Sequence, residues 1–70
     1  SKPQKTQKLS QREGECLMWK ASGKTSAEIA IILKLSEPTV NHYLTAACQK
    51  LGATNRAHAV YKAMRAGYLD

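Results

Sequence analysis

Segment 37–51 carries the side chains of this chain that best suit recognition of another molecule. If the segment is helical, at about 100° per residue, five side chains gather on one side: Pro38, Asn41, His42, Thr45 and Gln49. None of them is a cation, whereas an ordinary solvated helix face is rich in Lys and Glu. Amide, imidazole and hydroxyl groups suit the reading of base edges in double-stranded DNA, where Asn pairs with adenine and Thr contacts several bases. The alternative is a solvent-exposed face that happens to lack charge.

Cations flank this segment rather than lying on its polar side: Lys24, Lys34, Lys50 and Arg56. Such charges bind phosphates without sequence preference and fix the register of a protein on DNA. Lys24, Thr25 and Ser26 also begin a predicted helix, whose N-terminal N–H groups attract anions. For Thr25 the alternative is helix capping alone, and for each lysine it is a solvated side chain.

The composition agrees with an anionic partner. The 70 residues include 11 Lys and Arg against 5 Asp and Glu, a formal net charge of +6, which points to nucleic acid first and to an anionic membrane second. No apolar run approaches the roughly 18 residues that cross a bilayer, and we expect no membrane partner. The sequence has no Gly-rich phosphate loop, nucleophile elbow or paired carboxylates near a His, so we expect no enzyme.

The two cysteines carry no motif of their own. Cys16 and Cys48 lie far apart, and neither belongs to a CxxC pair. We expect both to be reduced, small apolar side chains in a cytoplasmic protein. A disulfide, or a metal site completed by His42 or His58, is the alternative. We expect no cofactor or metal in this chain.

Helix signals divide the chain after residue 8. Residues 1–8 are polar, which predicts a linker or disordered tail. Ser10 with Glu13, and Thr25 with Glu28, fit the capping-box pattern. Together with the glycines that follow helices, these signals predict helices over 11–22, 26–33, 37–51 and 55–66, the last capped by Thr54.

Apolar periodicity assigns an inner face to each predicted helix. The predicted core comprises Cys16, Leu17, Trp19, Ala21, Ile29, Ala30, Ile32, Leu33, Val40, Leu44, Ala47, Cys48, Leu51, Ala57, Val60, Tyr61 and Met64. A second face of the last helix, formed by Ala59, Ala63 and Ala66, would let another copy approach closely; alanines used only as helix formers are the alternative. Residues 9–70 are therefore predicted to form one all-α domain, a four-helix bundle. Helices 26–33 and 37–51, joined by three residues, form a helix-turn-helix with the second helix in the major groove.

These residues resemble the LuxR-type helix-turn-helix family of bacterial transcription regulators. The family pattern Leu-Thr/Ser-x-Arg-Glu is met at 9–13, Gly-Lys-Thr/Ser-x-x-Glu-Ile-Ala at 23–30, Ser-x-x-Thr-Val-Lys/Asn at 36–41, Lys-Leu-Gly at 50–52 and Arg-x-x-Ala-Val at 56–60. Trp19, Gly-Lys-Thr-Ser, Thr-Val-Asn and Asn55-Arg56 resemble the quorum-sensing branch, whose members bind acyl-homoserine lactones through a separate N-terminal domain.

The resemblance implies sequence-specific binding of an inverted-repeat promoter site in double-stranded DNA by a homodimer, with the fourth helix making the subunit contact. RNA polymerase is left open as a further partner. Family base-contacting positions fall on Asn41, His42 and Thr45. Family phosphate-contacting positions fall on Lys24, Thr25, Thr39, Lys50 and Arg56.

The order His42-Tyr43 departs from the family, which usually has a His in the second place. We expect Tyr43 to lie at the border of the core stripe and to contact phosphate, and which of the two side chains contacts a base stays open. The rival to DNA binding is a protein–protein adaptor domain. An adaptor predicts binding that hardly depends on salt, with the cation-free face meeting another protein.

Overall fold

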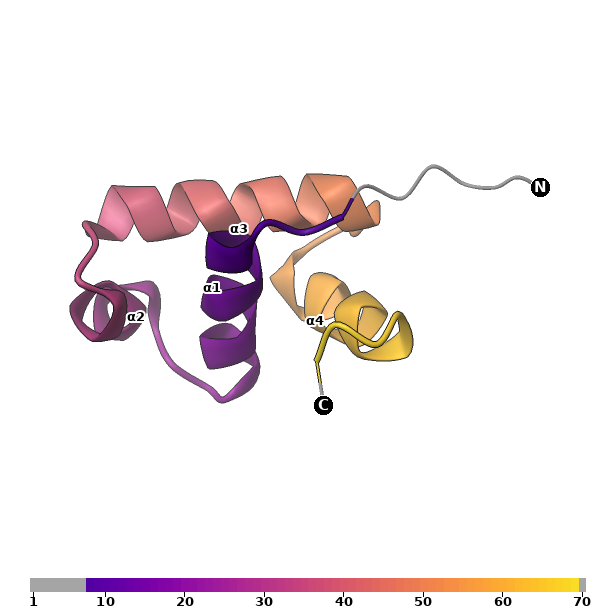
Figure 1. Cartoon of the computed structure of the whole chain (residues 1–70), viewed down its shortest axis with the longest axis horizontal. Helices are drawn as coiled ribbons and strands as arrows, with labels where there is room; N and C mark the ends of the chain where they lie inside the picture. Colours follow the sequence, from indigo (N-terminus) through magenta and orange to yellow (C-terminus); the bar gives the residue numbers. More distant parts are fainter. Residues whose placement is uncertain (1–7, 70) are drawn as a thin grey trace.

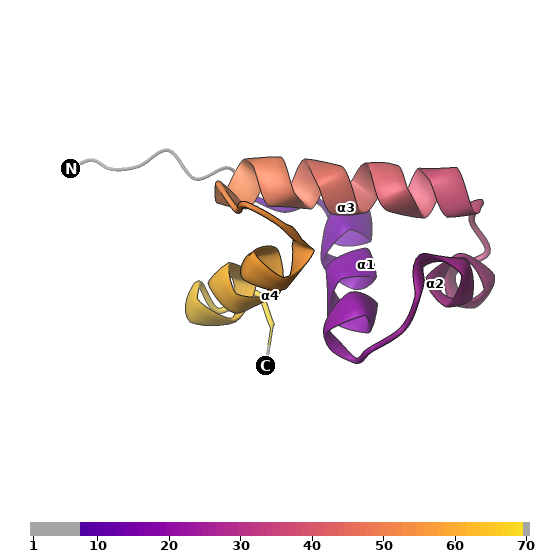
Figure 2. The ribbon, with the colours of Figure 1, turned by 180° about the vertical axis from the view of Figure 1, so that it is seen from behind.

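The computed structural model describes residues 8–69, and its regular structure is four α-helices. They are α1 (Gln11–Ala21), α2 (Ser26–Leu33), α3 (Glu37–Leu51) and α4 (Arg56–Arg65). The longest helix, α3, runs along one edge of the domain; α1 stands beneath its middle, and α2 and α4 lie below its two ends (Figures 1 and 2). The predicted all-α, four-helix class is confirmed. Of the predicted tail over 1–8, all but Lys8 lies outside the described residues.

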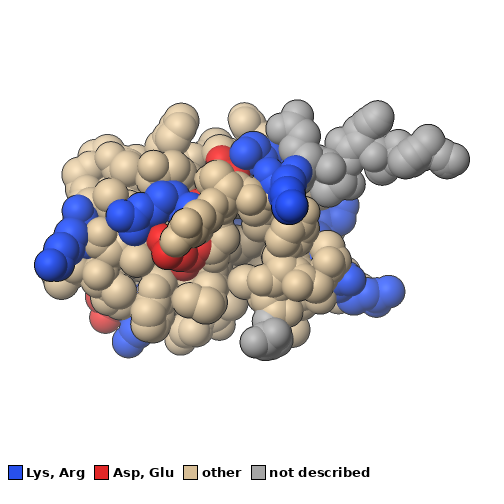
Figure 3. Space-filling view, in the orientation of Figure 1, with Lys and Arg blue, Asp and Glu red and all other residues tan. Residues whose placement is uncertain are grey.

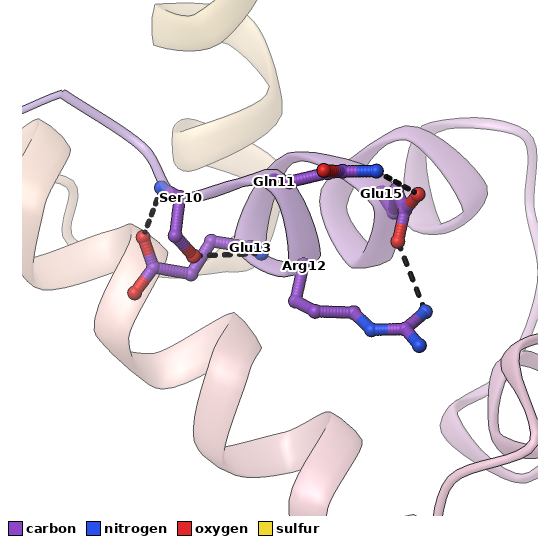
Figure 4. Close-up of polar contacts among 5 residues, drawn as sticks. All are labelled: Ser10, Gln11, Arg12, Glu13 and Glu15. Carbon is purple, nitrogen blue, oxygen red and sulfur yellow. Dashed lines mark hydrogen bonds and ion pairs between the residues drawn. The ribbon is translucent and has the colours of Figure 1, made fainter.

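Capping boxes begin the first two helices, as predicted. The Ser10 Oγ accepts a hydrogen bond from the Glu13 backbone N–H at 3.2 Å, and the Glu13 Oε1 accepts one from the Ser10 backbone N–H at 2.8 Å (Figure 4). The same reciprocal pair joins Thr25 and Glu28 at the start of α2. Because each box satisfies two N–H groups that a helix leaves without partners, the positions of α1 and α2 are fixed locally.

The start of α4 differs from the prediction. Asn55, and not Thr54, is its N-cap: the Asn55 Oδ1 accepts a hydrogen bond from the His58 backbone N–H at 2.8 Å. The Thr54 backbone N–H donates instead to the His58 Nδ1 at 3.0 Å. Asn is the stronger capping residue of the two, which explains why the helix begins one residue later than predicted.

The core lies beneath α3, which packs against each of the other helices. Its buried apolar residues are Cys16, Leu17, Ile29, Ala30, Val40, Leu44, Ala47, Leu51, Ala59 and Ala63. The predicted inner face of α3 is confirmed, with Cys48 only half-buried. Burying one Leu or Val side chain contributes about 1.5–3 kcal/mol, so this stripe fixes the rotation of α3 about its axis.

The predicted inner face of α4 was wrong for Ala57, Tyr61 and Met64, which are exposed, whereas Val60 is half-buried and packs against the core as predicted. Tyr61 and Met64 are 53% and 51% exposed, whereas Ala59 and Ala63 are fully buried. The helix carries two apolar arcs, and periodicity alone does not say which one is buried. Packing decides it, because small side chains let the α4 backbone come close to the rest of the bundle.

Two predicted core residues on the shorter helices also face outward. Ile32 on α2 and Ala21 at the end of α1 are exposed. The two-turn helix α2 is apolar along all of 29–33, so its periodicity is weak. Ile31, which is not among the predicted core residues, is 79% exposed.

Both thiols are free, and Cys16 is fully buried. Burial raises the pKa of the Cys16 thiol, and the negative charge of Glu15 raises it further. This agrees with the predicted role of Cys16 as a small apolar side chain.

Glu13 is the buried charged residue of the core and links α1 to α3. Its carboxylate accepts a hydrogen bond from the Lys50 ammonium at 2.9 Å while also capping α1. Burial raises the pKa of Glu13, but the hydrogen bonds from Lys50 and from the Ser10 backbone, with the positive charge of Lys50, outweigh it and leave the pKa below its usual value. The pair therefore fastens the first turn of α1 to the last turn of α3.

We expect Glu13→Gln to lower the free energy of unfolding by about 1–3 kcal/mol at neutral pH, because a charge-assisted hydrogen bond is lost. Since the pKa of Glu13 is lower in the folded state, its contribution is present above the ordinary carboxyl pKa and is lost as the pH falls through the folded value. Urea unfolding from neutral pH to about pH 3 measures this: the two proteins should differ most at neutral pH and converge in acid.

The matched control is Arg12→Gln, which removes an exposed ion pair to Glu15 of 3.1 Å (Figure 4). It should change stability by less than about 0.5 kcal/mol. A constant difference between wild type and Glu13→Gln across the pH range would contradict the assigned role of the carboxylate.

Candidate nucleic-acid interface

The outer face of α3 is open and uncharged. His42, Thr45 and Gln49 are all exposed on it. In the view of Figure 3 the surface along α3 is mostly tan, with Lys and Arg side chains toward both ends. A face of this kind offers hydrogen-bond donors and acceptors without a charge that would favour phosphate over bases.

His42 and Tyr43 divide between this face and the core. His42 is exposed, whereas Tyr43 is half-buried and packs against the core cluster. Their rings meet edge to face, with centroids 6.0 Å apart and an interplanar angle of 61°. The expected place of Tyr43 at the border of the core stripe is confirmed, and His42 is the side chain of the two that projects outward.

Asn41 differs from its neighbours because other helices already hold it. Its Oδ1 accepts a hydrogen bond from the Ser26 Oγ at 2.7 Å and one from the Arg56 Nη1 at 3.1 Å. The Arg56 Nη2 also approaches the Asn41 backbone oxygen at 3.4 Å. These three half-buried residues, here called the Asn41 cluster, join the first residue of α2, the first half of α3 and the first residue of α4.

The cluster changes what was expected of Asn41. To pair with adenine, an Asn side chain must both donate and accept a hydrogen bond, and an amide oxygen has two lone pairs. Both are taken by Ser26 and Arg56 in this structure. Nothing in the spacing of residues 26, 41 and 56 signals that they meet, so the sequence could not reveal the role of Ser26.

At the start of α2 the predicted phosphate site is partly occupied. The Thr25 backbone N–H donates to the Glu28 carboxylate at 2.8 Å, and this bond is the main reason why the pKa of Glu28 lies below its usual value. A negative carboxylate at this helix end opposes a phosphate there. Lys24 is half-buried and Thr25 is exposed beside it, so an anion at this helix end would meet these side chains rather than the Thr25 backbone N–H.

Two other residues predicted to contact phosphate, Thr39 and Lys50, already make hydrogen bonds within the protein. Thr39 is half-buried, and its Oγ1 accepts a hydrogen bond from the Ser36 Oγ at 2.8 Å, which leaves its own hydroxyl hydrogen to donate. Lys50 is committed to Glu13, with 27% of its side chain exposed. Lys50 therefore serves the fold first, and a phosphate would have to compete with a buried carboxylate.

The predicted subunit contact was wrong for Ala59 and Ala63. Both are fully buried in the core, so they cannot contact a second copy while the domain stays folded. Ala66 is exposed. The outward apolar residues of α4 are larger than predicted, and together with α1 they form an open groove of about 460 Å³ lined by Met18, Ala21, Ser22, Val60, Met64, Tyr68 and Leu69.

Residues 8–69 contain neither a metal-binding cluster of side chains nor a membrane-spanning helix. No three His, Cys, Asp or Glu side chains in this range gather closely enough to hold a metal ion. None of the helices described is long and apolar enough to cross a membrane.

Comparison with known proteins gives a family match and similar sequences. The family described as "Bacterial regulatory proteins, luxR family" matches residues 7–63. The chain is 50% identical over 62 residues to the transcriptional activator protein VanR of Vibrio anguillarum, covering 89% of this chain and 26% of that protein. It is 46% identical over 68 residues to the quorum sensing-dependent transcriptional regulator RpaR of Rhodopseudomonas palustris, covering 97% of this chain and 28% of that protein. The chain thus spans about a quarter of the length of these relatives.

Two solved structures share the fold. One, titled as the transcription factor GerE, superposes with a TM-score of 0.85 at 34% identity and covers 89% of this chain and 92% of that one. The other is a phage VqmA–DPO complex, with a TM-score of 0.78 at 33% identity, covering 86% of this chain and 28% of that one.

Proposed function

Because this chain belongs to the luxR family of bacterial regulatory proteins and has the family's DNA-binding helix-turn-helix domain, we propose that it binds an inverted-repeat promoter site as a dimer. In each subunit α3 lies in the major groove while α2 crosses the backbone. The relatives are transcription regulators and not enzymes, which leaves binding as the activity of this domain.

The exposed, uncharged face of α3 carries this proposal. His42 and Thr45 project from it, and a helix holds them at a fixed spacing while its inner stripe is buried. The imidazole and hydroxyl groups are suited to base edges. We propose these two side chains as the principal base contacts of this helix.

Cationic and hydroxyl groups around α3 supply affinity that does not depend on sequence. We propose phosphate contacts by four residues near the beginnings of three helices: Lys24 and Thr25 just before α2, Thr39 in the first turn of α3, and Arg56 as the first residue of α4. Tyr43 is a weaker candidate because its ring packs against the core. Lys50 is weaker as well, because it is bonded to Glu13.

We propose that the subunits meet through the outer side of α4. Tyr61 and Met64 are about half exposed there, and Ala66 lies on the exposed end of the helix. Apolar side chains that lie exposed side by side favour a contact between two copies of the domain, because the contact removes them from water. Arg65 lies over the Tyr61 ring at 5.8 Å and donates to its hydroxyl at 3.1 Å, which orders this face without covering it.

For the whole regulator, we propose a quorum-sensing protein with a separate signal-binding domain that responds to an acyl-homoserine lactone, because the relative RpaR is named as quorum sensing-dependent. RNA polymerase is a proposed second partner, because VanR is named as a transcriptional activator. The cytoplasm is the proposed location, since the promoter DNA lies there.

Selection of bound duplexes from a random pool at two salt concentrations tests the central proposal. We expect an inverted repeat whose half-sites lie about 10 base pairs apart, with weaker binding at the higher salt because counterions are released on binding. Absence of an enriched sequence, together with binding that ignores salt, would favour the protein–protein adaptor instead.

Thr45→Ala and Lys24→Ala should separate base reading from phosphate binding. We expect Thr45→Ala to cost about 1–3 kcal/mol at one base pair and to relax preference there, and Lys24→Ala to weaken all duplexes equally and lower the salt slope by about one unit. Titrations of the selected and a scrambled duplex measure both effects. Lys20→Ala, in the last turn of α1 and not among the proposed phosphate contacts, is the control and should leave the slope unchanged. Equal losses for Thr45→Ala on both duplexes would remove it from the base contacts.

Met64→Asp should weaken binding to a duplex with two half-sites by about tenfold or more, because the linked second contact is lost. Binding to a duplex with one half-site should stay within about twofold of wild type. Met64→Leu, which keeps the apolar volume, is the matched control and should behave as wild type on both. If Met64→Asp weakens the two duplexes alike, the subunit contact lies elsewhere.

A further inference from the structure

The Asn41 cluster joins the starts of α2 and α4 to α3. Ser26 is the first residue of α2 and Arg56 is the first residue of α4. Both donate to one oxygen atom on α3, at 2.7 Å from the Ser26 Oγ and 3.1 Å from the Arg56 Nη1. Residues 15 positions away on either side of Asn41 in the sequence therefore meet at one point.

The hydrogen-bonding capacity that the Asn41 and Arg56 side chains have left over consists of donors, whereas the Ser26 Oγ keeps its acceptor lone pairs. The Asn41 oxygen is saturated by two donors, so the amide retains only its two N–H groups. The Arg56 guanidinium has five N–H groups, of which two are directed at the Asn41 side-chain and backbone oxygens. A set of donors around a fixed positive charge matches the oxygens of a phosphate, which only accept.

The same arrangement is a poor match for adenine, the base with which Asn pairs. Reading of adenine requires an acceptor for its amino group beside a donor for N7, and the Asn41 Oδ1 has no lone pair left. To pair with adenine, Asn41 would have to release Ser26 or Arg56. Release of Arg56 would also free its guanidinium from a fixed position, since the Asn41 side-chain and backbone oxygens are the partners that orient it.

We infer that Asn41 is a positioning residue for phosphate binding: it holds the Arg56 guanidinium against α3 so that its remaining N–H groups meet the DNA backbone. This rests on the proposed function of α3 in the major groove. Base reading by α3 then falls to His42 and Thr45, and Asn41 sets the register of the domain on the duplex through Arg56.

A double-mutant cycle of Asn41→Ala and Arg56→Gln tests the inference. Kd is measured on the selected inverted-repeat duplex and on a scrambled duplex, at several salt concentrations. We expect Asn41→Ala to weaken both duplexes by the same factor, about 3–10-fold, and to lower the salt slope toward that of Arg56→Gln, a change of up to about one unit. Base preference should be unchanged at every position. The double variant should bind no worse than Arg56→Gln, because the two residues act as a unit.

Two further variants show whether a loss of DNA binding comes from a failure to fold. Ser26→Ala removes the other donor and leaves Arg56 in place, so its effect on the salt slope should be small. Arg56→Lys keeps the charge, but an ammonium cannot contact both Asn41 oxygens as a planar fork does. If Asn41→Ala does not give a cooperative thermal transition, Arg56→Lys supplies the test. It should weaken both duplexes by the same factor, and wild-type binding by Arg56→Lys would overturn the inference.

Two results would contradict the positioning role. One is a change of base preference at a single base pair in Asn41→Ala, and the other is a loss that adds fully to that of Arg56→Gln. Thr45→Ala, measured in parallel, distinguishes failure of the positioning role of Asn41 from failure of the proposed DNA-binding function. If Thr45→Ala alters base preference while Asn41→Ala does too, only the inference fails. If wild type shows neither preference nor salt dependence, the DNA-binding proposal itself fails.

Discussion

Burial of one stripe of α3 sets the direction of every other side chain on that helix. Val40, Leu44 and Ala47 are fully buried, and α1, α2 and α4 all pack against α3. A helix is rigid over four turns, so fixing one face fixes the opposite one. His42 and Thr45 are exposed for this reason, and their spacing does not depend on contacts of their own. A preformed face of this kind can meet a partner without first ordering itself.

Polar contacts at both ends of α3 complement this apolar stripe. At its end, Lys50 is bonded to the Glu13 carboxylate, which also caps α1. Near its start, Asn41 receives donors from α2 and α4. No buried side-chain nitrogen or oxygen atom in the described part of the chain lacks a hydrogen-bond partner. The polar groups therefore select one arrangement of the helices, while the apolar stripe supplies most of the burial.

The orientation of α4 assigns core packing and the proposed subunit contact to different faces of that helix. Its alanines face the core and its larger apolar residues face solvent, so the contact proposed between subunits uses side chains that the domain does not need for its own packing. The reverse orientation, which periodicity also permits, would bury Tyr61 and Met64 in place of Ala59 and Ala63. The burial of the alanines thus determines which surface of α4 is left for a partner.

Local signals in the sequence predicted the presence of all four helices and the resemblance to the family, although α4 begins one residue later than predicted. Capping boxes at Ser10 and Thr25 and the apolar repeat of α3 act within a few residues, and the bounds of α2 and α3 are those predicted. Tertiary packing decided three features that local signals do not encode. It determined which arc of α4 is buried and that Lys50 bonds to Glu13. It also brought Ser26 and Arg56 to the Asn41 side-chain oxygen. Those outcomes depend on atoms brought together from distant parts of the chain, and neither periodicity nor composition records which distant groups meet.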